Sequence, residues 1–127
     1  MSDLTSKNKA LMGRVYEEMW NQGQASLARE LFERPEGVER FVSKFLTFFG
    51  DLQHNVEEMI TEDDRVAVRF TARGTHTGQW LDFVPTRRAI TYTGVTLARI
   101  TGDKIAEHYT WWDKAGLIEQ IEGGDES

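Results

Sequence analysis

The sequence predicts an α+β fold, with helices in its first half and an antiparallel sheet in its second half. Two observations lead to this prediction. Apolar residues recur with a helical period as far as Phe49, and after Gly50 they alternate with polar residues, which is typical of strands with one buried face. The chain of 127 residues also has no Pro- or Ser-rich linker, so we expect a single domain over 1–127.

Three helices are expected in the first half of the chain. The first runs from Leu4 to Trp20 with its apolar residues on one stripe, and a glycine three residues later provides its stop. A second, shorter helix covers residues 25–32. Pro35 suits the first turn of the third helix, which continues to Phe49 and is apolar on more than one face.

Four strands are expected in the second half, arranged as two hairpins. An acidic turn joins the first pair of strands, at 53–60 and 65–73. Thr, Tyr, Val and Ile are frequent in 89–100, which is expected to pair with 104–113 across a Gly-Asp turn. The connection at 77–87 is long for a loop, and we expect it to form a rim or a lid.

Composition and charge exclude several functions. The chain has no cysteine, which excludes disulfides, thiolate catalysis and zinc sites built on cysteine. Its 21 acidic and 15 basic residues give a net charge of −6, which argues against nucleic-acid and anionic-membrane partners. The three histidines lack the spacing of metal-binding motifs, and phosphate-loop and dinucleotide motifs are missing, so no metal or cofactor is expected.

Features of targeting are also missing from the sequence. The first seven residues contain no apolar segment of the kind found in secretory signals. The longest apolar runs are too short to cross a bilayer. A cytoplasmic protein is therefore expected.

Five short motifs occur in the order in which one known family carries them. With these motifs, which span most of 15–121, the chain resembles the SnoaL-like polyketide cyclase family of the NTF2-like superfamily. The motifs are Trp-Asn-Gln-Gly at 20–23, Arg-Gly-Thr-His-Thr-Gly at 73–78, Pro-Thr-Arg-Arg at 85–88, Arg-Ile-Thr-Gly-Asp-Lys-Ile at 99–105, and His108 with Trp111-Trp112-Asp113.

The resemblance implies an NTF2-like cone, in which a curved, mostly antiparallel sheet wraps around three N-terminal helices. An apolar pocket is expected at the open end of the cone. Family members commonly dimerise through the outer face of the sheet, so we expect a homodimer. Trp111 and Trp112 are neighbours on one strand and must face opposite sides of the sheet, so one can belong to the core and the other to the outer face.

The usual first strand of the family is missing from this chain. In the family, a polar loop and a short strand lie between the second and third helices, and this strand forms one wall of the pocket. Here residues 31–34 run directly into Pro35. We expect a more open cone, a partner subunit that fills the gap, or helices exchanged between subunits.

The acid/base pair of the family is replaced as well. By the resemblance, the aspartate that acts as general acid/base corresponds to Thr110, and the assisting histidine corresponds to Thr96. A threonine hydroxyl does not exchange a proton at neutral pH as a tuned carboxyl group does. The cyclase mechanism therefore does not carry over residue by residue.

His108 and Asp113 are the remaining candidates for catalysis. His108 shares the pocket-facing side of the strand with Thr110, where a neutral imidazole can act as a base; the alternative is a hydrogen-bonded histidine near the floor of the cone. Asp113 lies beside apolar rings, where a carboxylate can shuttle protons; the alternative is a cap on the following turn. The expected pocket lining consists of Tyr16, Trp20, Phe45, Tyr92, Thr96, Thr110 and Trp112.

Several other residues are ambiguous from the sequence. Trp80, Leu81 and Phe83 on the connecting segment belong either to a lid or to a dimer contact. His76 is expected to be structural or to lie at the rim, and the face taken by His54 is open.

Together these observations predict a protein that binds a small apolar molecule, polyketide-like or polycyclic. By resemblance it acts as a cofactor-independent cyclase, isomerase or hydratase. The alternative is a non-catalytic module on the same scaffold that holds a ligand or a protein partner.

Overall fold

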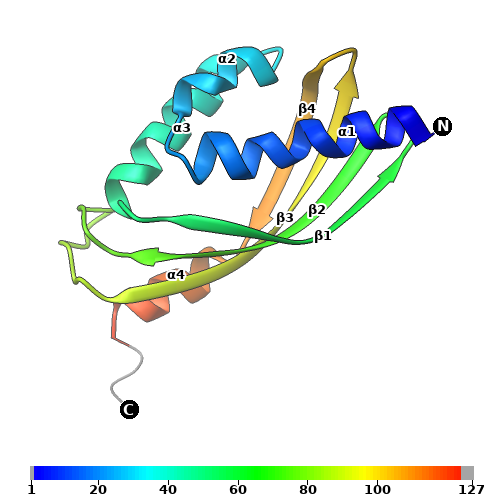
Figure 1. The fold of residues 1–127 in the computed structure, drawn as a ribbon. Coiled ribbons are helices and arrows are strands. Elements are labelled where there is room, and N and C mark those ends of the chain that lie inside the picture. Colours follow the sequence, from blue (N-terminus) through cyan, green and yellow to red (C-terminus); the bar gives the residue numbers. More distant parts are fainter. Residues whose placement is uncertain (1, 124–127) are drawn as a thin grey trace.

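The computed structural model describes residues 2–123 and confirms the α+β fold (Figure 1). Its strands form one antiparallel sheet in the order β1-β2-β3-β4, which confirms the two expected hairpins. In chain order the elements are α1 (Ser2–Arg14), the π-helix η1 (Val15–Trp20), the 3₁₀ turn η2 (Ala25–Leu27), α2 (Ala28–Leu31), α3 (Pro35–Phe48), β1 (Gln53–Glu62), β2 (Arg65–Thr75), β3 (Ala89–Thr101), β4 (Lys104–Trp112) and α4 (Lys114–Ile121).

The sheet curves around the N-terminal helices (Figure 1). The register shifts between Val56 and Glu58 on β1 and between Arg99 and Ile100 on β3. Because such irregularities increase local twist and bend the strand, they help the sheet to curve. The result is a concave face that holds the core and a convex face on the other side.

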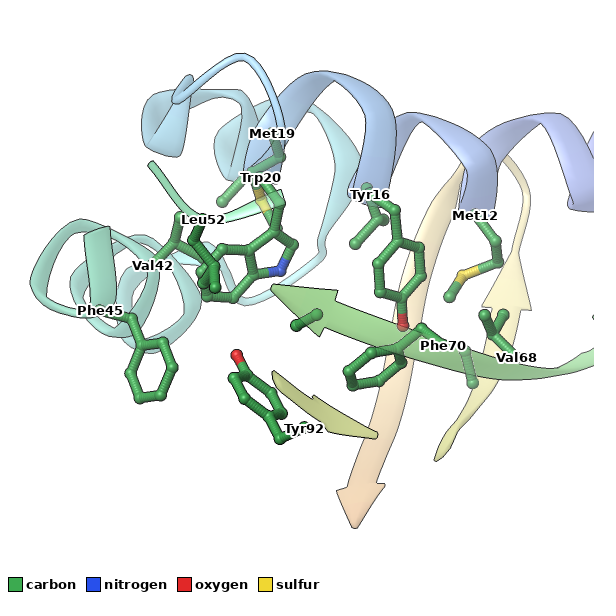
Figure 2. Close-up of a cluster of buried hydrophobic side chains, with 14 of the residues drawn as sticks. Met12, Tyr16, Met19, Trp20, Val42, Phe45, Leu52, Val68, Phe70 and Tyr92 are labelled. Carbon is green, nitrogen blue, oxygen red and sulfur yellow. The ribbon is translucent and has the colours of Figure 1, made fainter. Parts of the chain in front are cut away.

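The concave face is covered by α1 and η1. Alternation along β2 places Val66, Val68 and Phe70 on this face, where they are almost fully buried. Met12 and Tyr16 pack against them from the helical side (Figure 2). The apolar stripe predicted for the first helix is therefore the stripe that meets the sheet.

A short extended segment lies where the resemblance implies a missing strand. Phe32 is extended and forms an isolated parallel bridge with Ile105 on β4. The Glu33 amide donates a hydrogen bond of 2.9 Å to the Ile105 carbonyl oxygen. Within residues 2–123 nothing else pairs with the outer edge of β4. Since α1 and η1 contact the sheet of their own chain, helix exchange is not needed to cover it.

The connection between β2 and β3 is anchored by His76. The Thr86 amide donates to His76 Nδ1 at 3.2 Å, and the backbone of His76 pairs with Arg87 and Arg88. Trp80, for which the sequence left a lid or a dimer contact open, is buried against Phe45 and other rings of the core. The segment therefore contributes Trp80 to the core.

The sequence did not predict α4. The expected turn after Asp113 is the first turn of this helix, which buries Leu117 and Ile121. The Gln120 side chain holds α4 on β3 by exchanging hydrogen bonds with the backbone of Thr91 at 2.7 and 2.9 Å. In residues 2–123, every helix is too short or too polar to cross a membrane.

Candidate functional site

A cavity of about 520 Å³ lies between the concave face of the sheet and helices η1 and α3. Its lining is mainly aromatic, and it also includes Arg34, Phe41, His54, Phe70 and His108. The seven residues that the sequence placed in the pocket all line it: Tyr16, Trp20, Phe45, Tyr92, Thr96, Thr110 and Trp112.

The π-helix η1 supplies two of the cavity's aromatic side chains. Its wider winding is seen in the hydrogen bond of 2.9 Å from the Asn21 amide to the Tyr16 carbonyl oxygen, five residues back. Gly23, with a φ of 67°, ends the helix in a Schellman cap, in which the Gln24 amide donates to the Met19 carbonyl oxygen at 2.9 Å. Tyr16 and Trp20 point from this segment toward the sheet (Figure 2). Such segments are rare and frequently mark functional sites, and this one could not be read from the sequence.

Phe45 of α3 is the centre of the aromatic wall. Its ring centroid lies 6.1 Å from those of Trp20 and Tyr92 and 5.6 Å from that of Trp112, in edge-to-face geometry. Phe41 stacks on it at 5.2 Å. Rings packed in this way present both faces and edges, which suits a flat aromatic ligand.

A glycine on β3 makes room for Phe70. A Cβ atom at Gly94 would lie 2.5 Å from the Phe70 ring and 2.8 Å from the Trp111 carbonyl oxygen. The Phe70 ring therefore covers Gly94 on the neighbouring strand and still borders the cavity. This close approach explains a glycine in the middle of a strand.

His54 occupies the cavity floor, although the sequence left its face open. It lies on β1 and is 7% exposed, packed against the rings of Trp20, Phe70 and Tyr16 at centroid distances of 4.7, 5.3 and 5.7 Å. Burial lowers the pKa of His54 to about 4, so its imidazole is neutral at pH 7. His54 lies opposite Ala72, a buried residue of β2, and this register could have indicated the face that His54 takes.

His108 lies on β4 at the open side of the cavity. Its ring contacts Phe32 edge-on at 5.0 Å, and desolvation lowers its pKa, so that the imidazole is neutral at pH 7. Arg34, at the start of α3, shares this opening. The structure thus places a neutral base beside the space that a ligand would occupy.

Asp113 does not line the cavity. Its carboxylate accepts a hydrogen bond of 2.9 Å from the Gly116 amide and caps the N-terminus of α4. This is the capping role that the sequence offered as the alternative. Among residues 2–123, no three histidine or acidic side chains form a group that could hold a metal ion.

Comparison with known proteins places this cone in a family. The model of the SnoaL-like polyketide cyclases matches residues 10–121. The chain belongs to the SnoaL-like polyketide cyclase family. No curated protein matches the sequence.

Solved structures share the SnoaL-like fold over most of the chain. AclR from Streptomyces galilaeus, named as a hydroxylase, has a TM-score of 0.85 and 23% identity, covering 92% of this chain and 82% of its own. A protein of Acidithiobacillus ferrooxidans named as a polyketide cyclase has a TM-score of 0.84 and 17% identity, covering 91% and 94%. IdmH from Streptomyces antibioticus, also named as a polyketide cyclase, has a TM-score of 0.78 and 25% identity, covering 91% and 98%.

Within this SnoaL-like cone, Thr96 and Thr110, which the resemblance matches to an acid/base pair, form a row of hydrogen-bonded hydroxyl groups with Tyr16. The Tyr16 hydroxyl donates to Thr96 Oγ1 at 2.9 Å, and the hydroxyl oxygens of Thr96 and Thr110 share a hydrogen bond of 2.8 Å. Burial raises the pKa of Tyr16 to about 12. These three hydroxyl groups therefore supply hydrogen bonds to the cavity, but none of them ionises near neutral pH.

Proposed function

We propose that this SnoaL-like protein binds a small aromatic or polycyclic molecule in its cavity and acts on it without a cofactor. The reaction is a cyclisation, isomerisation or hydration in which His108 is the base. The observation that carries the proposal is an aromatic cavity with a neutral imidazole at its open side. Its volume of about 520 Å³ lies within the range of small-molecule sites, roughly 300–1,000 Å³.

His108 and Thr110 lie two residues apart on the same side of β4 and both border the cavity. A ligand held against the aromatic wall would therefore contact both. The neutral imidazole can take a proton from a carbon next to a carbonyl group. A hydroxyl of the Tyr16–Thr96–Thr110 chain can donate a hydrogen bond to the oxyanion that develops. The imidazolium then returns the proton to the product.

A second candidate function is ligand binding without catalysis. No aspartate or glutamate of residues 2–123 lines the cavity. The hydroxyl groups of Thr96 and Thr110 are hydrogen-bonded to each other. Asp113 is engaged in capping α4. These three observations favour a scaffold that has kept the family's cavity and lost its carboxylate chemistry.

One experiment separates the two functions. Hydroxylated and methylated naphthalenes, anthraquinones and linear polyketide mimics are first screened by thermal shift, since a ligand raises the unfolding temperature whether or not it is converted. Bound compounds are then incubated with the wild type, with His108→Gln and with the control Asp113→Asn, and products are followed by chromatography. We expect turnover by the wild type and the control, and loss in His108→Gln.

Two outcomes would contradict the catalytic proposal. A ligand that binds tightly and is never converted supports the binding module. If none of these compounds raises the unfolding temperature, the cavity does not take aromatic molecules and both functions fail.

We also propose that two copies of the chain associate through the convex face of the sheet. Ile60, Val95, Tyr109 and Trp111 are all more than 40% exposed. The strand register brings Val95 opposite Trp111, and the Tyr109 and Trp111 rings lie 6.3 Å apart. Exposed aromatic and aliphatic side chains gathered on one sheet face are typical of an interface, and the family resemblance supports a homodimer.

A further inference from the structure

We infer that His54, together with the hydroxyl of Tyr92, recognises a hydroxyl group on an aromatic ligand at the floor of the cavity. The inference rests on the proposed function, because it requires an aromatic ligand in this cavity, and it names the chemical class of that ligand. Neither residue belongs to the positions matched to the family's acid/base pair.

The His54 ring is a polar group enclosed by aromatic rings. Trp20, Tyr16, Phe70 and Tyr92 surround it, with ring centroids between 4.7 and 6.5 Å away. Its Nδ1 atom is buried and has no hydrogen-bond partner among the described residues. A ligand in the cavity cannot pair with this enclosed atom. It can pair with the other ring nitrogen, Nε2, which is not enclosed and makes no hydrogen bond within the described residues.

The backbone that carries His54 is held in place by Asn21. The Asn21 Oδ1 atom accepts a hydrogen bond of 2.6 Å from the His54 amide, and its Nδ2 atom donates one of 2.9 Å to the His54 carbonyl oxygen. Gln53 adds a bond of 3.0 Å from its side chain to the Asn21 carbonyl oxygen. The Trp-Asn-Gln-Gly motif that ends the first helix thus takes the place of a strand partner at the edge of β1. It fixes the imidazole against the cavity.

Tyr92 provides the complementary group. It lines the same cavity, its ring centroid lies 6.5 Å from that of His54, and its hydroxyl makes no hydrogen bond that the described residues reveal. Figure 2 shows this hydroxyl pointing toward Trp20, on the side where the helical layer covers the sheet. A neutral imidazole offers one acceptor nitrogen, and the tyrosine offers a donor.

A ligand hydroxyl matches this pair of groups. It can donate its proton to the imidazole nitrogen and accept a hydrogen bond from the Tyr92 hydroxyl. A methyl group at the same place would leave both protein groups unpaired. A carboxylate would be buried without a cation, because the rings that surround His54 carry no charge, and such burial is strongly unfavourable.

The test compares 2-naphthol with 2-methylnaphthalene, which differ mainly in the hydroxyl group. Dissociation constants are measured by quenching of tryptophan fluorescence in the wild type, His54→Phe and Tyr92→Phe. Tyr109→Phe is the matched control, because it removes the same hydroxyl from the exposed convex face. We expect the wild type and the control to prefer 2-naphthol by about tenfold, the value of one well-formed hydrogen bond. In His54→Phe the preference should vanish while 2-methylnaphthalene still binds.

The outcomes distinguish the inference from the proposed function. Equal binding of both compounds by the wild type, or an undiminished preference in His54→Phe, overturns the role of His54 and leaves an aromatic-binding cavity intact. If neither compound binds the wild type, the proposed function fails as well. Should His54→Phe not fold, ¹⁵N chemical shifts of the wild-type imidazole decide. They should move with 2-naphthol and stay unchanged with 2-methylnaphthalene, and no movement with 2-naphthol overturns the inference.

Discussion

Thr96 and Thr110 face each other across β3 and β4, and their hydroxyl oxygens lie 2.8 Å apart. Thr96 also accepts a hydrogen bond from the buried hydroxyl of Tyr16. The two positions that the resemblance matches to an acid/base pair are therefore joined to each other in this chain. Their arrangement stabilises the cavity wall and, in the proposed mechanism, leaves proton transfer to the imidazole of His108.

Replacing Thr96 by valine should destabilise the protein. The change keeps the shape of the side chain but removes the acceptor of the Tyr16 hydroxyl, which is then buried without a partner. We expect a loss of about 1–3 kcal/mol in the free energy of unfolding, measured by urea denaturation. Thr110→Val, at the exposed end of the chain of hydroxyls, should lose less than the Thr96 variant. The double variant Tyr16→Phe/Thr96→Val should recover part of the loss, and strict additivity would contradict the coupling.

Burial of His54 should make the stability depend on pH in a defined direction. Because its pKa falls from 6.5 to about 4 on folding, the unfolded chain takes up a proton at higher pH than the folded chain does. The stability that a neutral His54 contributes is therefore present above pH 6.5 and is lost as the pH falls toward 4. The total change is about 3 kcal/mol, since each pH unit corresponds to about 1.4 kcal/mol.

The measurement is the free energy of unfolding at several pH values for the wild type and His54→Phe. The other two histidines titrate in both proteins, so the difference between the two curves isolates His54. The difference between the two curves should change between pH 6.5 and pH 4, because the wild type loses stability on acidification and His54→Phe does not lose this contribution. Parallel curves would show that His54 titrates normally in the folded chain.

Asp113 should matter for stability and not for activity. Its carboxylate caps α4 through the Gly116 amide, so Asp113→Ala should lower the free energy of unfolding by about 1 kcal/mol. Asn is also a good capping residue, and Asp113→Asn should lose only a few tenths. Both variants should bind cavity ligands as the wild type does. A loss of turnover in Asp113→Asn at unchanged stability would instead assign a catalytic role to this residue.

Periodicity predicted most of the fold and missed two local features. The change of period after Gly50 located the helical layer and both hairpins, because burial of one face decides that pattern. The π-helix η1 depends on how Val15–Trp20 packs against the sheet, which a single sequence does not reveal. The helix α4 was missed because a glycine at 116 lies in its first turn, where Gly disfavours a helix and favours a turn.

The alternation of side chains along the strands predicts much of the cavity lining on the sheet, but it left the face of His54 open. Thr96, Thr110 and Trp112 border the cavity because they share the inner face of β3 and β4, which alternation along the strands predicts. Alternation along a strand does not separate a cavity-lining ring from a core ring, and the expected lining therefore omits Phe70, which borders the cavity. The face of His54 was left open because the pairing irregularity after Val56 interrupts the alternation over the rest of β1, although the regular register from His54 to Val56 carries the signal that could have placed it.

The convex face offers the most direct test of assembly. Trp111 is 61% exposed, so replacing it by glutamate removes few contacts within the chain and places a charge in the centre of the proposed interface. We expect a dimer for the wild type and a monomer for Trp111→Glu at micromolar concentration, measured by light scattering. Ser43→Glu is the control, because it adds the same charge on the exposed side of α3, away from the sheet. Unfolding temperatures should separate loss of assembly from loss of folding. A monomeric wild type would contradict the dimer, and the exposed aromatic pair of Tyr109 and Trp111 would then require a different partner.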